Sequence, residues 1–446
     1  MRKLILLAAL FATPAFAQSD PAEGVSQERL RADVERMVAF GTRHTLSSQD
    51  HPTRGIGAAI RWGMESFEET SATCGGCLEV VTPERMFTGN RIPNGVLIRN
   101  AVAIQRGTER PNEVVIIQGH IDSRVSDVMD AVSDAPGAND NASGSALVLE
   151  AARALSQRTY PTTIVYALLA GEEQGLYGGQ LLADYAREQG WTVKAVLNND
   201  IIGGSCGSDG TCDAAHLRVF SEGTRADADD ATRAQMRSKG GGNDSPSRNL
   251  SRWLDTLAGA YPEGLDVRQV WRSDRMGRGG DHIPFLEAGF PAIRFSAAIE
   301  DYEHQHQDLR TENGVTYGDT VSEMDFAFLA GATRMNVRAV DALARAPMPP
   351  IVQLDGMVRA DVGLEFLPVA GAVRYNIWRR ATDARDWELR DTLEADAAAD
   401  LNSIVLAPDR GDDWIFGVSA VAADGAESPV ASAVPGGDFY PLPRAE

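Results

Sequence analysis

The sequence predicts an α/β protein, with a mostly parallel sheet sandwiched by helices and a small C-terminal β-sandwich. Apolar strand-like runs alternate with amphipathic helical runs between residues 113 and 198, a pattern typical of a sheet covered by helices on both faces. Polar residues follow these strands at their C-terminal ends, which form the edge where open α/β sheets bind ligands. After residue 350 the pattern changes to short, closely spaced strands, which indicates a β-sandwich.

Apolar residues at helical spacing predict two helices near the start of the chain, at residues 26–41 and 54–69. The strands of the sheet are expected at residues 78–81, 95–106, 113–118, 162–169, 193–198, 216–220, 268–272 and 292–296. Further helices are expected at residues 142–155, 176–188, 247–260, 281–288 and 321–345. The polar, glycine-rich stretch 223–249 predicts a surface insertion.

The length of 446 residues favours two folded units. The proline-rich segment 346–350 is typical of a linker, and it divides a main domain, residues 18–345, from a smaller one, residues 351–440. The smaller domain resembles a fibronectin type III module in its proline-bounded start, its tyrosine strand at 375–378 and its Gly-x-Glu-Ser-Pro turn at 425–429. Because the linker follows the last candidate site residue, the small domain is expected to be dispensable for chemistry.

Charge and the first residues of the chain bear on partners and location. The formal net charge of −21 argues against a nucleic-acid partner. Residues 1–17 combine a basic start, a short apolar run and an Ala-x-Ala end, which predicts a signal peptide and export to the periplasm or the extracellular space. No other apolar stretch reaches transmembrane length.

Four cysteines, an even number, suggest two disulfide bonds in an exported protein. We expect the local pairs Cys74–Cys77 and Cys206–Cys212, because glycines separate the members of each pair. A zinc site made by all four thiolates is the alternative. It is disfavoured because the second pair has C-x5-C spacing instead of the C-x2-C spacing of the first.

Imidazole and carboxylate groups occur in a fixed order along the main domain. They are His120 with Asp122, then Asp140, then Glu172 with Glu173, then Asp200, and finally His304 and His306. Hard oxygen ligands mixed with imidazole suit zinc or a similar divalent ion. Five ligand positions are too many for one tetrahedral zinc that keeps a site open for water. Two zinc ions sharing one carboxylate would use all five, which favours a two-metal hydrolase.

Each member of this set has a plain structural explanation when taken alone. Asp140 precedes a predicted helix and could be its N-cap, and Glu172 with Glu173 could form an exposed acidic turn. His120 and Asp122 can face the same way at a strand end, so that Asp122 could hold the second nitrogen of a metal-bound imidazole. The joint occurrence of the set at one edge of a sheet favours the metal site.

Five segments carry a resemblance to the di-zinc aminopeptidase family, which includes bacterial leucyl aminopeptidases, aminopeptidase Y, glutamate carboxypeptidase II and glutaminyl cyclase. They are residues 119–123, 137–144, 170–176, 199–203 and 280–285, and the resemblance spans residues 25–345. It implies that Asp140 bridges two zinc ions, that His120 and Asp200 complete one, and that Glu173 and a late histidine complete the other. Glu172 would be the general base. The family motif has an acidic residue four positions after the late histidine, which favours His304, with Asp308, over His306.

The function expected from this set is that of an exported aminopeptidase with two zinc ions, acting on peptide or protein substrates. A carboxypeptidase or a glutaminyl cyclase on the same fold is the nearest alternative, and a non-catalytic binding or adhesion protein is a more distant one. A serine hydrolase is disfavoured, because the Gly-x-Ser-x-Gly segment 203–207 is not followed by a predicted helix. The sequence contains no His-Glu-x-x-His motif of single-zinc proteases.

Overall fold

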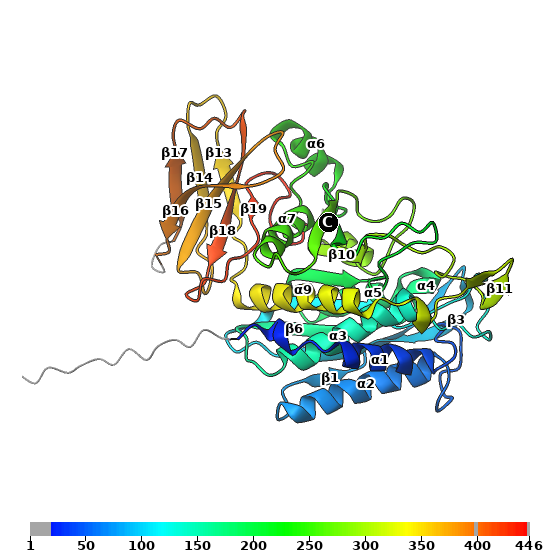
Figure 1. The fold of residues 1–446 in the computed structure, drawn as a ribbon. Coiled ribbons are helices and arrows are strands. Elements are labelled where there is room, and N and C mark those ends of the chain that lie inside the picture. Colours follow the sequence, from blue (N-terminus) through cyan, green and yellow to red (C-terminus); the bar gives the residue numbers. More distant parts are fainter. Residues whose placement is uncertain (1–18, 397–399, 444–446) are drawn as a thin grey trace, which may run out of the picture.

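The structure, a computed structural model, describes residues 19–396 and 400–443 and consists of a large α/β part and a smaller all-β part (Figure 1). The predicted signal peptide, residues 1–17, lies outside the described residues. Within the described ranges, no helix has both the length and the apolar character that a membrane crossing requires.

An eight-stranded mixed sheet forms the centre of the α/β part, in the order β1-β4-β6-β5-β7-β10-β8-β9. The strands are β1 (Glu79–Val81), β4 (Ala101–Gln105), β5 (Arg110–His120), β6 (Thr162–Leu169), β7 (Thr192–Asn199), β8 (His216–Phe220), β9 (Asp266–Val270) and β10 (Ala292–Ala297). The four central strands, β6, β5, β7 and β10, are parallel to one another, whereas β4 and β1 on one side and β8 on the other add antiparallel pairings. The predicted fold class is confirmed.

Helices cover both faces of this sheet. The bounds are α1 (Gln27–Val38), α2 (Ile56–Thr73), α3 (Ser143–Leu155), α5 (Tyr177–Glu188), α6 (Asp230–Lys239), α7 (Pro246–Gly259), α8 (Ile283–Glu287) and α9 (Phe326–Arg345). On β5, Val115 and Ile117 pack into the core with α1, α2, α3 and α9, whereas Val114 and Ile116 pack into the core with α5 and α8. This alternation explains why the strand reads as a continuous apolar run: both of its faces are buried.

The single strand predicted at 95–106 is two strands in the structure. β3 (Ile92–Arg99) pairs with β2 (Glu84–Gly89) in a separate hairpin, and β4 joins the large sheet. Asn100, which is fully buried, separates them. Its side-chain amide donates to the Gly178 carbonyl and accepts from the Ala170 amide, so it ties the end of β6 to the start of α5.

The C-terminal part is a two-sheet antiparallel β-sandwich. One sheet contains β13 (Val352–Asp355), β14 (Val362–Phe366) and β17 (Asn402–Leu406), and the other contains β15 (Arg374–Ala381), β16 (Glu388–Glu394), β18 (Trp414–Val421) and β19 (Ala431–Ser432). Phe366 and Tyr375, one from each sheet, pack edge to face in the core between them, with ring centroids 4.8 Å apart. The fibronectin type III assignment stays a prediction.

The sandwich is packed against the α/β part and is not held by an extended tether. The predicted linker, residues 346–350, is buried along its whole length. The Arg380 guanidinium donates to Asp244 at 2.6 Å, and the Trp253 indole N–H of α7 donates to the Glu427 carbonyl at 3.0 Å. The predicted surface insertion contains α6, and its Gly240 lies so close to Ile415 that a Cβ atom would come within 2.9 Å of that side chain.

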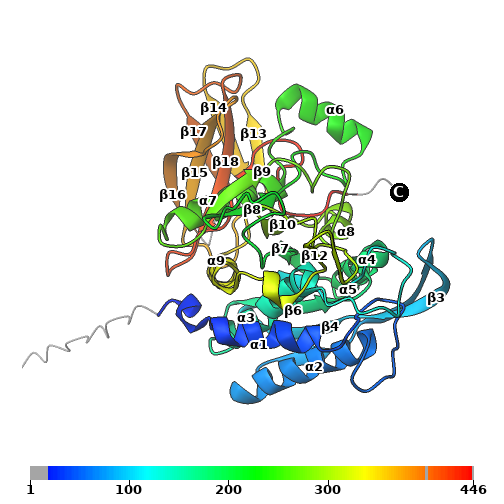
Figure 2. The same ribbon diagram turned by 45° about the vertical axis from the view of Figure 1, so that its right-hand side comes forward.

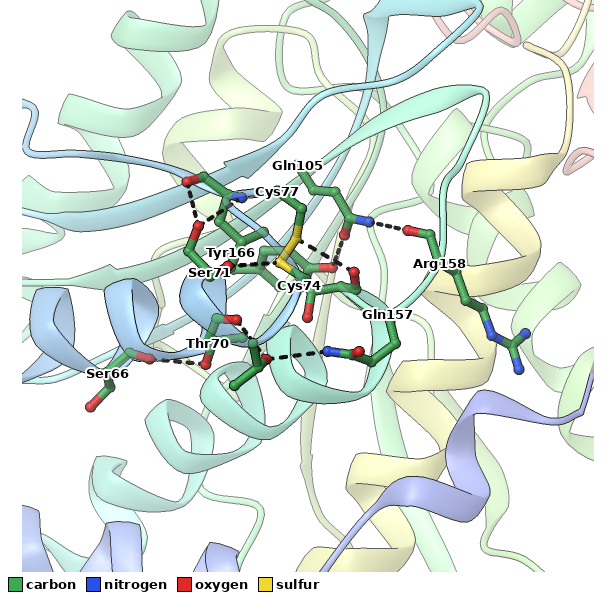
Figure 3. The surroundings of a disulfide bond; sticks show 12 residues. Ser66, Thr70, Ser71, Cys74, Cys77, Gln105, Gln157, Arg158 and Tyr166 are labelled. Atoms are coloured by element: carbon green, nitrogen blue, oxygen red, sulfur yellow. Dashed lines mark hydrogen bonds between the residues drawn. A yellow bond between two sulfur atoms is a disulfide. The ribbon is translucent and has the colours of Figure 1, made fainter.

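Both predicted disulfide bonds, Cys74–Cys77 and Cys206–Cys212, are present. The first closes the turn between the end of α2 and β1 (Figure 3). Beside it, the Ser71 hydroxyl donates to the Leu78 carbonyl and accepts from the Leu78 amide, so the crosslinked turn is also held by hydrogen bonds.

Candidate metal centre

Three neighbouring parallel strands end at the candidate site. His120 is the last residue of β5, and Asp200 directly follows β7. Glu172 opens the short helix α4 (Glu172–Gly175) after β6. Because β6, β5 and β7 are adjacent and parallel, their carboxyl ends bring these three side chains together.

The first ligand group consists of His120, Glu172 and Asp200, each of which offers one donor atom within 4.8 Å of the others. His120 Nε2 lies 3.7 Å from Asp200 Oδ1, and both side chains are almost fully buried. The three donors converge on one point, as a metal ion would require.

The second ligand group consists of Asp140, Glu173 and His306. His306 Nε2 lies 2.8 Å from Asp140 Oδ2 and 2.9 Å from Glu173 Oε1. The other oxygen of Asp140, Oδ1, lies 3.2 Å from His120 Nε2 of the first group. The two oxygens of one carboxylate therefore face the two groups, which is the arrangement that a bridging ligand needs.

The structure places His306, and not His304, in the second group. The His304 ring faces the other way, with Nδ1 2.8 Å from Asp301 and Nε2 3.5 Å from Glu323. The sequence prediction preferred His304 because an acidic residue, Asp308, follows it by four positions. In the structure Asp308 binds Ser126 and does not reach the ligand groups.

A different carboxylate, Asp319, lies beside the second group. It comes from the same long connection between β10 and α9 that carries His306. The hairpin of β11 (Arg310–Glu312) and β12 (Val315–Tyr317) separates it from His306 in sequence, so a spacing rule could not find it. Its two oxygens accept the backbone amides of Asn139 and Asp140, each at 2.7 Å. Asp319 therefore fixes the segment that carries the shared carboxylate.

Asp122 supports the site through hydrogen bonds to the residues around it. Its carboxylate is fully buried and accepts the backbone amides of both Glu172 and Glu173, as well as the Thr45 hydroxyl. Its Oδ1 also lies 3.4 Å from His120 Nδ1. Asp122 thus orients His120 of the first group, as the sequence predicted. It also positions Glu172 of the first group and Glu173 of the second, which the sequence did not predict.

Arg294 was not predicted from the sequence. It lies on β10, is fully buried, and holds Asp200 Oδ2 at 3.0 Å and Asp274 Oδ1 at 2.6 Å. The sequence did contain a signal for its role, because Arg294 is the charged residue within the apolar run 292–297. A charged residue in a buried strand needs a partner of opposite charge.

Buried carboxylates dominate the electrostatics of the centre. Burial and the neighbouring carboxylates Glu173 and Asp200 raise the pKa of Glu172 well above its usual value. Burial lowers the pKa of His306, but Glu173 and Asp140 outweigh this and raise it to about 10. The pKa of His120 is likewise raised, since burial is outweighed chiefly by Glu172.

The donor set fits divalent cations. Five carboxylates, Asp122, Asp140, Glu172, Glu173 and Asp200, are gathered around two imidazoles, and burial of unpaired anions is costly. Of the five, Glu173 receives the guanidinium of Arg124 at 2.8 Å and Asp200 that of Arg294. Asp140, which joins the two groups, has no arginine partner among the described residues, so cations placed at the two groups would neutralise it.

Comparison with known proteins agrees with this geometry. The model of peptidase family M28 matches residues 100–321. A relative from Leptosphaeria maculans, named a probable zinc metalloprotease, is 40% identical over 93% of this chain and 96% of its own length. The chain belongs to peptidase family M28. The resemblance stated from the sequence motifs is therefore confirmed at the level of the family.

Two solved structures show which other proteins share this fold. The LapA aminopeptidase of Legionella pneumophila matches with a TM-score of 0.51 and 19% identity, over 73% of each chain. The glutaminyl cyclase of Fimbriiglobus ruber matches with a TM-score of 0.50 and 17% identity, over 71% of this chain and 95% of its own. At these identities the likeness concerns the fold, which an aminopeptidase and a cyclase share.

Replacing each of the two late histidines by alanine tests which of them belongs to the second group. His306→Ala should lower the amount of zinc bound per chain, measured by atomic absorption after dialysis, because it removes one of three donors. His304→Ala is the matched control, two positions away in the same loop, and should keep the wild-type zinc content. Zinc loss in His304→Ala with retention in His306→Ala would reverse the assignment.

Asp319→Asn tests whether the shared carboxylate needs its support. The amide side chain can accept only one of the two backbone amides, so zinc affinity measured by chelator competition should fall by about 10–100-fold, as is typical when a group that orients a ligand is lost. Glu312→Gln, an equivalent change in the exposed β11–β12 hairpin, should leave the affinity unchanged. An Asp319→Asn protein with wild-type affinity contradicts the role.

Proposed function

We propose that this protein is a zinc-dependent aminopeptidase that removes N-terminal residues from peptides. The observation that carries the proposal is the pair of ligand groups that share Asp140, with Glu172 beside them. The M28 relative named a probable zinc metalloprotease supports zinc and peptide hydrolysis. The fold is shared with the LapA aminopeptidase and also with a glutaminyl cyclase, so the choice of hydrolysis rests on the ligand groups for two metals.

Two zinc ions are proposed. His120, Asp200 and one oxygen of Asp140 would hold the first, and Glu173, His306 and the other oxygen of Asp140 the second. Zinc supplies a Lewis acid and lowers the pKa of water when it is bound in such a site. Glu172 belongs to the first group by position, but Asp140 Oδ1 can supply the third donor in its place. The Glu172 carboxylate is then free for proton transfer.

Glu172 is the proposed proton acceptor and donor. Its carboxylate lies within 4.8 Å of donor atoms of His120 and Asp200, where it can take a proton from water and return one to a leaving amine. Asp122 is a positioning residue for this step. It accepts the backbone amides of Glu172 and Glu173 and so keeps the two carboxylates in place relative to His120.

Export is also proposed. The two disulfide bonds of the structure belong to oxidising compartments such as the periplasm or the extracellular space. The signal-peptide pattern of residues 1–17 supports the same conclusion from the sequence.

A substrate panel tests the reaction. The zinc-loaded full-length protein should hydrolyse aminoacyl p-nitroanilides and peptides with a free amino terminus, and N-acetylation should abolish turnover. Release of C-terminal residues from N-acetylated peptides would replace the proposal with a carboxypeptidase. Ammonia release from an N-terminal glutaminyl peptide without hydrolysis would replace it with a cyclase.

Glu172→Gln and Glu173→Gln form a matched pair that separates proton transfer from metal binding. Glu172→Gln keeps the shape of the side chain but cannot accept a proton, so kcat should fall by about 10²–10⁴-fold or more while zinc content is retained. Glu173→Gln should lose zinc first. Loss of zinc in Glu172→Gln would make Glu172 a ligand, and full activity of Glu172→Gln would refute the mechanism.

A further inference from the structure

A second cavity, the interdomain cleft, lies between α7 and the β-sandwich. Its volume is about 790 Å³, within the range of roughly 300–1,000 Å³ typical of small-molecule sites. One wall is the face of α7 that carries Asn249, Arg252 and Thr256, and the other is built from sandwich residues, including the turn 424–428. In both ribbon views the sandwich lies on the side of the molecule away from α4, the helix that begins with Glu172 and Glu173 (Figures 1 and 2).

Three half-buried tryptophans line the cleft, namely Trp253 of α7, Trp378 of β15 and Trp387 of the sandwich. Each indole N–H already has a protein acceptor: the Glu427 carbonyl for Trp253, the Ser419 hydroxyl for Trp378 and the Asn249 side chain for Trp387. Carbon surface is therefore what the rings can offer to a ligand, although the Arg380 guanidinium lies over the Trp387 ring at 5.3 Å.

Arg252 supplies unused hydrogen-bond donors in the α7 wall. Its side chain is only 4% exposed, and its Nη1 donates to Asn249 and to the Asn243 carbonyl. Its Nε and Nη2 have no acceptor within the described part of the chain. Both atoms are buried, so Arg252 contributes to the α7 wall a guanidinium whose hydrogen-bonding capacity is only partly used.

The charges of the lining decide against several ligand classes. Five carboxylates, Asp255, Asp266, Asp386, Asp424 and Glu427, face three guanidiniums, Arg252, Arg345 and Arg385. The excess of carboxylates disfavours nucleic acids and other polyanions. Several of these groups pair with one another, as Arg385 does with Asp386 at 2.8 Å and Arg345 with Asp424 at 2.8 Å. A purely apolar ligand would displace water from this charged rim without hydrogen-bonding to it. A ligand with both ring faces and many hydroxyl groups satisfies both kinds of surface, since a hydroxyl can donate to a carboxylate and accept from a guanidinium.

We propose that the interdomain cleft binds a neutral oligosaccharide, with sugar rings against the tryptophans and hydroxyl groups on the charged side chains of the rim. The proposal is independent of the reaction at the metal centre. It assigns the sandwich and α7 a joint role: to attach the enzyme to a glycan.

Binding is tested with the full-length protein and a panel of soluble oligosaccharides. Cello-, xylo-, malto- and chito-oligosaccharides are the neutral probes, and oligogalacturonate is the acidic one. Binding is measured by calorimetry and by the change in tryptophan fluorescence. We expect saturable binding of at least one neutral member and none of oligogalacturonate. The proposal fails if no neutral member binds saturably, or if only the acidic one does.

Variants locate the binding. Thr256→Trp fills the cleft from an exposed position and removes only the hydrogen bond from the Thr256 hydroxyl to the Arg252 carbonyl within α7. Trp387→Ala removes one ring. Each should weaken binding by at least about tenfold. Trp414→Ala, which changes a tryptophan of the same sandwich outside the cleft, should bind normally, and all three should keep wild-type turnover of an aminoacyl p-nitroanilide. Undiminished binding in Thr256→Trp would overturn the assignment, because that variant retains every wall of the cleft.

Discussion

The structure of the α/β part depends on one constraint, the gathering of buried carboxylates at the carboxyl edge of the central sheet. Asp140 is its centre, because its two oxygens face the two ligand groups at 3.2 Å from His120 and 2.8 Å from His306. Carboxylates packed this closely repel one another and lose their hydration, so they persist only where cations or hydrogen-bond donors are supplied. The surrounding fold supplies both.

The support comes from elements that are distant in sequence. Asp319 fixes the backbone of Asp140, Arg294 holds Asp200, and the fully buried Arg43 donates to the carbonyls of Pro136 and Gly137 just before the shared carboxylate. These groups restrict motion of the candidate ligands, and such preorganisation keeps a site accurate. The disulfide Cys206–Cys212 closes a loop whose Ser208 hydroxyl binds Asp301, at the start of the segment that carries His306.

The C-terminal sandwich shares buried polar contacts with the α/β part, so the two parts act as one unit where they meet. Asp244 accepts from Arg380 at 2.6 Å, and Arg252 lies 3.7 Å from the same carboxylate. Both guanidiniums keep unused donors, and Arg252 is the one that lines the interdomain cleft. The cleft therefore arises from the docking of the two domains, and neither domain alone would form it.

The sequence by itself determined the fold class, most helices and strands, both disulfide bonds and the family. It could do so because these follow from local periodicity, from close cysteine pairs and from polar residues at strand ends, which parallel strands bring together. The tertiary structure alone brought His306 instead of His304 to the second group, and it alone revealed Asp319, Arg294 and the docked sandwich. These features depend on the path of a long loop, with a hairpin inserted into it, and on contacts between residues far apart in sequence. No local spacing encodes such contacts, because the free energy that selects them arises only when the whole chain is packed.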